Sequence, residues 1–98
     1  MRVRFTKLAN EDLQQAYLYI VQESPESARD IIERIKKAIN TLCQYSSLGK
    51  PGRIKGTREF VVSNTPFILV YRQKQGTLQI LSVLHTSKKY PYRVDGIA

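Results

Sequence analysis

Two helix-spaced apolar patterns, whose predicted helices are joined by only two or three residues, constrain the fold of this chain more than any other feature. The apolar residues of the first pattern predict an amphipathic helix over about residues 8–22: Leu13, Ala16, Tyr17 and Ile20. Ser24-Pro25 then indicates a second helix start, because Ser can cap free backbone amides and Pro suits the first helical position, where no donor is needed. Helices joined by so short a connection must form an antiparallel hairpin.

The second pattern is a single apolar stripe that continues past the Ser-Pro pair. Its members are Ala28, Ile31, Ile32, Ile35, Ile39 and Leu42. We expect this helix to run to about Tyr45 and to end at Ser46, Ser47 and Gly49. Ahead of the hairpin, residues 2–5 alternate basic and apolar side chains, which predicts a short strand with one buried face, and Thr6 offers a hydroxyl for the first helix start.

The sequence of the second half of the chain predicts a small sheet. Residues 49–56 contain three Gly and one Pro, so we expect no regular element there. The predicted strands are Arg58–Val62, Phe67–Arg72 and Leu78–His85, with turns at residues 63–66 and at Gln75-Gly76. The last strand is apolar on both faces, so we expect it to be central and covered on both sides.

These elements predict an α+β fold in the order β-α-α-β-β-β, with a helical hairpin packed on a small antiparallel sheet. All 98 residues fit one domain, with residues 91–98 as a loose tail. No stretch approaches the ~20 apolar residues of a membrane span, and the N-terminus lacks the apolar run of a signal peptide. Together with the single Cys43, which rules out an internal disulfide, this favours a cytoplasmic protein.

The positive charge is concentrated in the second half of the chain. Residues 1–49 hold seven Lys/Arg and six Asp/Glu, a net charge of +1, whereas residues 50–98 hold nine Lys/Arg and two Asp/Glu, a net charge of +7. Such a half attracts polyanions, so we expect phosphate backbones or an acidic protein as partner. The alternative is a generic soluble basic surface.

Several kinds of chemistry are excluded or disfavoured by the residues present. One His and one Cys cannot build a structural zinc site, no Gly-Lys-Ser/Thr closes a phosphate-binding loop, and there is no Gly-x-Ser-x-Gly elbow. We therefore expect no metal and no small-molecule cofactor. Glu11 and Asp12 are adjacent on a helix, so they should point in different directions and be solvated. Cys43 should be a small core or boundary residue.

A first candidate site is the basic glycine loop. Glycines let backbone approach a ligand closely, and Lys or Arg supply phosphate contacts. Its cations are Lys50, Arg53, Lys55 and, at the strand start, Arg58. The alternative is a flexible, solvated connector.

A second candidate site follows the last predicted strand directly. His is the side chain best placed to move protons at neutral pH, Tyr can stack on a base or donate a proton, and Lys or Arg can stabilise charge on a phosphate. The members are His85, Lys88, Lys89, Tyr90, Tyr92 and Arg93. A base, an acid and positive charge around the scissile phosphate suffice for RNA cleavage without metal. The alternative is that His85 is a hydrogen-bonded strand-end residue and Tyr90 a core cap.

Short runs spread over essentially the whole chain resemble a known family in their order and spacing. The runs are Val3-Arg4-Phe5-Thr6, Leu13…Tyr17…Tyr19-Ile20, Ser24-Pro25-Glu26-Ser27-Ala28, Leu48-Gly49-Lys50-Pro51-Gly52-Arg53, Gly56-Thr57-Arg58-Glu59-Phe60-Val61-Val62, Ile68-Leu69-Val70-Tyr71-Arg72 and Ile80-Leu81-Ser82-Val83-Leu84-His85. On these runs the chain resembles the RelE/ParE toxin superfamily, in its RelE/StbE-like branch. The resemblance implies a compact α+β toxin that is encoded with an antitoxin, whose extended or helical segment wraps the toxin.

The resemblance leaves the target open, because RelE-like members cut mRNA on the ribosome and ParE-like members poison DNA gyrase. Val61, Ser63 and Ile68 stand at about the places where RelE-type nucleases carry basic residues. His85 roughly matches a histidine that some ribosome-dependent relatives use, but gyrase-targeting members also tend to show a Val-Leu-His run. Tyr90 or Tyr92 could match a tyrosine that some relatives use.

Three functions therefore remain open. The first is a ribosome-dependent mRNA endonuclease with Arg58, His85 and Tyr90 as catalytic residues. The second is a non-catalytic gyrase inhibitor that uses the basic tail and the sheet face, and the third is a non-toxic nucleic-acid or ribosome-binding module. In each, the basic loop and the His85 end of the last strand should converge on one exposed surface. The residues expected to bind nucleic acid or another target are Lys50, Arg53, Lys55, Lys88, Lys89, Tyr92 and Arg93.

Overall fold

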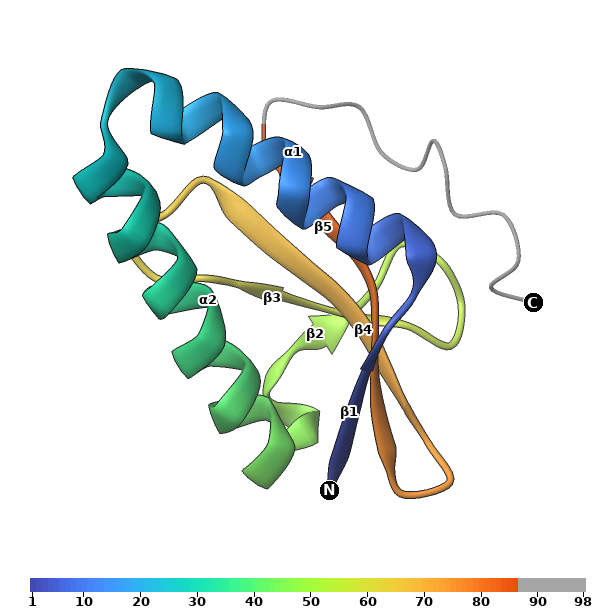
Figure 1. Cartoon of the computed structure of the whole chain (residues 1–98). Coiled ribbons are helices and arrows are strands. Elements are labelled where there is room, and N and C mark those ends of the chain that lie inside the picture. The colour runs from blue at the N-terminus through green and yellow to red at the C-terminus, as the bar shows by residue number, and fades with distance from the viewer. Residues whose placement is uncertain (87–98) are drawn as a thin grey trace.

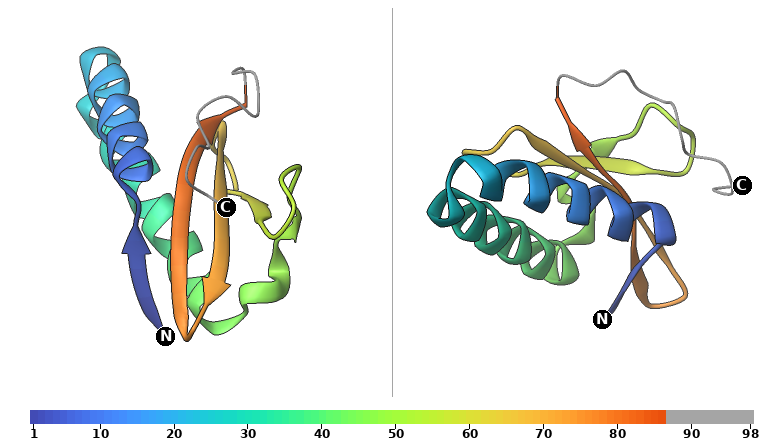
Figure 2. Two further views of the ribbon diagram at one scale, coloured as in Figure 1. Left: turned by 90° about the vertical axis from the view of Figure 1, so that its right-hand side faces the viewer. Right: turned by 45° about the horizontal axis from the view of Figure 1, so that its top comes forward.

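The computed structural model describes residues 1–86, which form a helical hairpin lying on one face of a five-stranded sheet (Figure 1). The hairpin consists of α1 (Lys7–Glu23) and α2 (Pro25–Gln44). The view in Figure 2 (left) shows both helices on the same side of the strands. The predicted hairpin is confirmed, and no helix in the described part of the chain is long and apolar enough to cross a membrane.

Both helix starts follow from local sequence. The Thr6 hydroxyl oxygen accepts a hydrogen bond from the Ala9 amide at 3.1 Å, and the Ser24 hydroxyl oxygen accepts one from the Ser27 amide at 3.1 Å. Pro25 occupies the first position of α2, where its missing N–H costs nothing. These side chains satisfy amides that a helix end leaves free, so the predicted caps are confirmed.

The sheet is mixed, and this corrects the expected antiparallel sheet. Its strands are β1 (Arg2–Phe5), β2 (Lys50–Pro51), β3 (Arg58–Val61), β4 (Phe67–Lys74) and β5 (Thr77–His85), in the order β1-β5-β4-β3-β2. The short links make β3, β4 and β5 antiparallel, as predicted. β1 pairs with β5 in parallel instead, because the chain leaves β1 through the helices and returns beside it only with β5, after three intervening strands.

The segment expected to hold no regular element contains two short ones. A 3₁₀ turn, η1, spans Ser46–Leu48, and β2 pairs with the start of β3 through Lys50 and Pro51. Pro51 can take part because β2 is an edge strand of the sheet. The N–H that proline lacks is therefore not needed to pair with a further strand.

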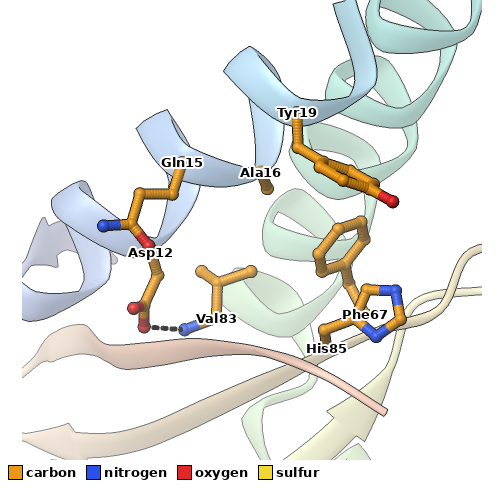
Figure 3. Close-up of a pocket in the computed structure, with 7 residues that line it drawn as sticks. All are labelled: Asp12, Gln15, Ala16, Tyr19, Phe67, Val83 and His85. Atoms are coloured by element: carbon orange, nitrogen blue, oxygen red, sulfur yellow. Dashed lines mark hydrogen bonds between the residues drawn. The ribbon is translucent and has the colours of Figure 1, made fainter. Parts of the chain in front are cut away.

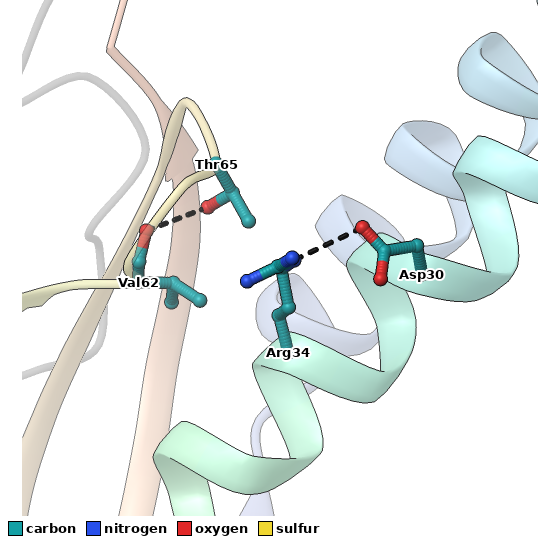
Figure 4. Close-up of polar contacts among 4 residues, drawn as sticks. All are labelled: Asp30, Arg34, Val62 and Thr65. Carbon is teal, nitrogen blue, oxygen red and sulfur yellow. Dashed lines mark hydrogen bonds and ion pairs between the residues drawn. The ribbon is translucent and has the colours of Figure 1, made fainter.

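The two turns of the sheet show why their residue types are needed. Gln75 and Gly76 both have positive φ, 51° and 73°, as a two-residue hairpin turn of the primed kind requires. In the turn between β3 and β4, Asn64 takes a φ of 61°, and the Thr65 hydroxyl donates to the Val62 carbonyl at 2.9 Å. Figure 4 shows this turn across from α2, where Arg34 is paired with Asp30 at 3.0 Å and points toward Val62.

The sheet buries side chains on both faces. The larger cluster lies between the helices and the sheet, and a smaller one lies on the opposite face, formed by Val70, Leu81 and Leu84 with Ile68 packed against them. β5 is buried on both faces, as expected, but it has a strand on each side only over Thr77–Ile80, so the expectation of a central strand is confirmed for that part of it. Cys43 packs half-buried against the larger cluster, as expected of a boundary residue.

The predicted buried face of β1 is wrong for most of its length. Val3 keeps 37% of its surface exposed, and only Phe5, next to the start of α1, packs against the core. The reason is position: β1 lies at the edge of the sheet, and the helices cover the sheet beyond it.

Candidate functional site

The basic loop between β2 and β3 is anchored by a buried carboxylate. The Glu59 side chain is 1% exposed, and its Oε2 accepts a hydrogen bond from the Arg53 amide at 2.9 Å. The Arg53 Nε lies 3.5 Å from Oε1 of the same carboxylate. Because Glu59 pairs with Val70 of the second cluster, this contact lies on the sheet face away from the helices. The loop is thus held in one shape rather than being a loose connector.

Local hydrogen bonds also shape the loop tip and leave its lysines exposed. The Gly52 amide donates to the Thr57 carbonyl at 2.7 Å, and the Thr57 hydroxyl donates to the Ile54 carbonyl at 2.6 Å. A Cβ on Gly52 would collide with the Thr57 hydroxyl, so only glycine fits there. Lys55 in this loop and Lys50 in the adjoining β2 are both exposed, so the segment can present positive charge at fixed positions.

Arg58 holds the chain where α2 ends rather than facing an open site. Its Nη1 donates to the Gly49 carbonyl at 2.7 Å and to the Ser47 carbonyl at 3.4 Å. Next to it the buried Tyr71 hydroxyl donates to the Ser46 carbonyl at 2.6 Å and accepts from the Gly49 amide at 2.9 Å. Burial raises the pKa of Tyr71 above its ordinary value of 10.0, while the Gly49 hydrogen bond and the Arg58 charge lower it.

His85 ends β5 at the rim of a cavity under α1 (Figure 3). Its ring meets Phe67 edge to face, with centroids 5.4 Å apart and an interplanar angle of 89°. The cavity has a volume of about 360 Å³. Its lining residues are Asp12, Gln15, Ala16, Tyr19, Phe67, Val83 and His85.

Arg58 and His85 do not converge, which corrects the expected common surface. Arg58 is level with Tyr71 on β4, and His85 is level with Phe67, four positions away on the same strand. At ~3.4 Å per residue this separates their backbones by roughly 14 Å along the strand, and two strand spacings of about 4.8 Å separate them across the sheet. The basic loop and the His85 cavity are therefore two sites. Five of the predicted site residues lie outside the described residues: Lys88, Lys89, Tyr90, Tyr92 and Arg93.

Asp12 is the residue of this candidate site that sequence reasoning missed. It was expected to be solvated, but its Oδ2 accepts hydrogen bonds from the Ser82 hydroxyl at 2.8 Å and from the Val83 amide at 3.0 Å. The cause is non-local: β1 ends level with Ile80, so the rest of β5 has no strand beside it on that edge. Asp12 from α1 and Thr6, whose hydroxyl donates to the Leu81 carbonyl at 2.9 Å, take the place of the missing strand.

The described residues hold no group of three or more His, Cys, Asp or Glu side chains that could bind a metal ion. The basic loop can attract an acidic partner, and the cavity combines a carboxylate, an amide, an imidazole and aromatic rings.

Comparison with known proteins gives one consistent answer. The family model described as "ParE toxin of type II toxin-antitoxin system, parDE" matches residues 3–90. The chain is 37% identical over 90 residues to a protein of Sinorhizobium fredii (strain NBRC 101917 / NGR234) named "Putative toxin Y4kP", covering 92% of this chain and 93% of that protein. It is also similar to a chain of the solved "Chromosomal ParDE TA system from P. aeruginosa", with a TM-score of 0.75 and 27% identity over 87% of this chain and 95% of that one. The resemblance to the RelE/ParE superfamily is thus confirmed, and the chain belongs to the ParE toxin family of type II toxin–antitoxin systems.

Proposed function

We propose that this toxin arrests growth by binding DNA gyrase without catalysing a reaction, and that its cognate antitoxin relieves the arrest by covering the toxin. Membership of the ParE family favours gyrase, which the ParE-like members of the superfamily poison. The observation that carries the non-catalytic reading is the separation of Arg58 from His85.

An RNA-cleaving site would need the side chains of Arg58 and His85 to contact the same phosphate. A general base or acid acts within about 2.6–3.2 Å of the proton it moves, and a stabilising cation must contact the same reacting centre. The Arg58 guanidinium instead donates to two backbone carbonyls near η1. Val61, Ser63 and Ile68, where RelE-type nucleases carry basic residues, supply no charge. The proposed role therefore uses the protein as a binding surface.

Direct observation of cellular mRNA separates this proposal from an mRNA endonuclease. After induction of the toxin in a bacterial host, primer extension should show intact mRNA, while the cells become filamentous and signal DNA damage. Codon-aligned cuts that vanish in the His85→Ala variant would instead make the protein a ribosome-dependent endonuclease. Normal growth after induction of the folded protein would contradict toxicity itself.

The basic loop is the part of this surface that we propose contacts the acidic target. Its lysines project from a backbone held in place by Glu59, so little conformational entropy of the loop is lost when a partner binds. Electrostatic attraction should then raise the association rate and fall with ionic strength.

Replacing Lys50 and Lys55 together with Gln should weaken gyrase binding by a few-fold to tenfold at low salt and reduce its salt dependence. Surface plasmon resonance with immobilised gyrase at two salt concentrations measures both effects. Lys36→Gln with Lys74→Gln is the matched control, because it removes the same charge from two exposed lysines outside the loop. An equal loss of affinity in both double variants would mean that Lys50 and Lys55 act only through the overall net charge of the protein.

A further inference from the structure

We infer that the cavity between α1 and the end of β5 binds the guanidinium group of an arginine side chain from a partner protein. The cavity lies under the middle of α1 (Figure 3). The strand register puts it at the end of the sheet away from Arg58. The inference concerns the chemistry of this pocket and does not depend on which protein the toxin inhibits.

The anionic group of the cavity is held in a fixed orientation. Asp12 Oδ2 accepts from Ser82 and from Val83, whereas Oδ1 accepts no hydrogen bond from residues 1–86. Within residues 1–86, one carboxylate oxygen is thus used for anchoring, and the other is left for a ligand. A carboxylate whose rotamer is already fixed loses little entropy when it binds a cation.

The rest of the wall suits a flat cation on an alkyl stem. Tyr19, Phe67 and His85 present aromatic rings, and Ala16 and Val83 present apolar surface. A guanidinium can stack on an aromatic face while its methylene groups cover apolar atoms. It is also more weakly hydrated than an ammonium group, which favours arginine over lysine in such a site.

Charge and size exclude the alternatives. No Lys or Arg is among the described residues that line the cavity, so none of the residues 1–86 in its wall offsets the repulsion between a phosphate and the carboxylate. A nucleic acid is better served by the basic loop, which lies elsewhere on the molecule. A volume of about 360 Å³ is near the lower end for ligand pockets and suits one side chain.

The test is a titration of the isotope-labelled full chain with N-acetyl-arginine methylamide, followed by NMR. The amides of Ser82 and Val83 and the ring signals of Tyr19 and His85 should shift together and saturate. The uncharged, nearly isosteric N-acetyl-citrulline methylamide should give no saturable shift. If citrulline shifts the same signals equally, or if adenosine monophosphate binds there more tightly than the arginine probe, the inference is wrong.

Asp12→Asn is the decisive variant, because an amide oxygen can still accept from Ser82 and Val83 while the negative charge is lost. Binding of the arginine probe should weaken by at least about tenfold, the expected loss for a charge-assisted contact. Glu33→Gln removes the same charge from an exposed position on α2 and should leave binding unchanged. Equal binding by Asp12→Asn and the wild type would overturn the inference.

Tyr19→Ala provides a second test that does not touch the hydrogen bonds of the core. Tyr19 is 67% exposed, so the loss of its side chain should leave the fold intact. Removal of the aromatic face should weaken probe binding by about two- to fivefold. Binding as tight as in the wild type would remove the aromatic part of the pocket from the inference.

Discussion

Tyr71 joins the sheet to the chain that leaves α2. Its side chain is fully buried, and its hydroxyl serves two backbone groups in the turn, the Ser46 carbonyl and the Gly49 amide. Gly49 must be glycine, because a Cβ there would collide with the Tyr71 hydroxyl. One tyrosine thus fixes the position of the turn that leads into β2 and the basic loop.

Tyr71→Phe should lower the free energy of unfolding by about 1–3 kcal/mol, because the Ser46 carbonyl and Gly49 amide lose a partner. Urea denaturation followed by circular dichroism measures the change. Tyr45→Phe, at an exposed tyrosine, is the matched control and should change little. Equal effects of the two substitutions would contradict the role given to the hydroxyl.

The raised pKa of Tyr71 predicts a pH dependence of stability with a definite sign. Below pH 10.0, the ordinary pKa, the hydroxyl is protonated in both states and its contribution is complete. Above that pH the unfolded chain loses the proton first, so stability falls as the pH rises through the folded pKa. Urea midpoints at pH 8 and above pH 10 should show a decline that is smaller in Tyr71→Phe. A decline of the same size in both proteins would contradict this assignment.

Asp12 fixes α1 to the part of β5 that has no strand beside it. Asp12→Ala would leave the Ser82 hydroxyl and the Val83 amide without their partner and should cost about 1–3 kcal/mol of unfolding free energy. Asp12→Asn, which keeps an acceptor, should cost less. Thermal or urea unfolding of the two variants measures the difference, and equal losses would mean that the acceptor contributes little.

At the scale of the elements, the features set by neighbouring residues could be predicted from the sequence and the non-local ones could not. The Thr6 and Ser24 caps, the Gln75-Gly76 turn and the central last strand depend on short patterns. The parallel pairing of β1 and the contact from Asp12 join residues about 70 or more positions apart. No local pattern encodes such a contact, so the exposed Val3 and the anchored Asp12 were both predicted wrongly.

The candidate site divides in the same way. The cations of the loop and the histidine at the end of β5 were visible as residue types in the sequence. Their separation depends on the register of β3 and β5 against β4, which the sequence does not encode locally. The contact between Arg53 and the buried Glu59 depends on how the loop folds against the sheet, which no local pattern encodes.

The contribution of the Ser24 cap to the stability of the protein can be measured with a single substitution. Ser24→Ala should lower the free energy of unfolding by about 1 kcal/mol, because the Ser27 amide loses its acceptor at the start of α2. Ser63→Ala, at an exposed turn residue, should stay within about 0.5 kcal/mol of the wild type. Chemical denaturation compares them, and a Ser24→Ala variant as stable as Ser63→Ala would contradict the capping role.

At the scale of the whole molecule, the fold separates the two surfaces that we propose bind partners. The loop beyond β2 carries exposed cations on a braced frame, and the cavity under α1 carries a fixed carboxylate among aromatic rings. The ParE fold brings these surfaces to different places on one small sheet. That arrangement suits a protein that engages partners at separate points better than one that assembles a single catalytic centre.

The most direct measurement is DNA supercoiling by purified gyrase in a reaction that contains no ribosomes and no RNA. Addition of the purified, folded toxin should stop the supercoiling of relaxed plasmid, and prior addition of its cognate antitoxin should prevent that effect. Undiminished supercoiling at a large molar excess of a toxin that still arrests growth in cells would contradict gyrase as the target.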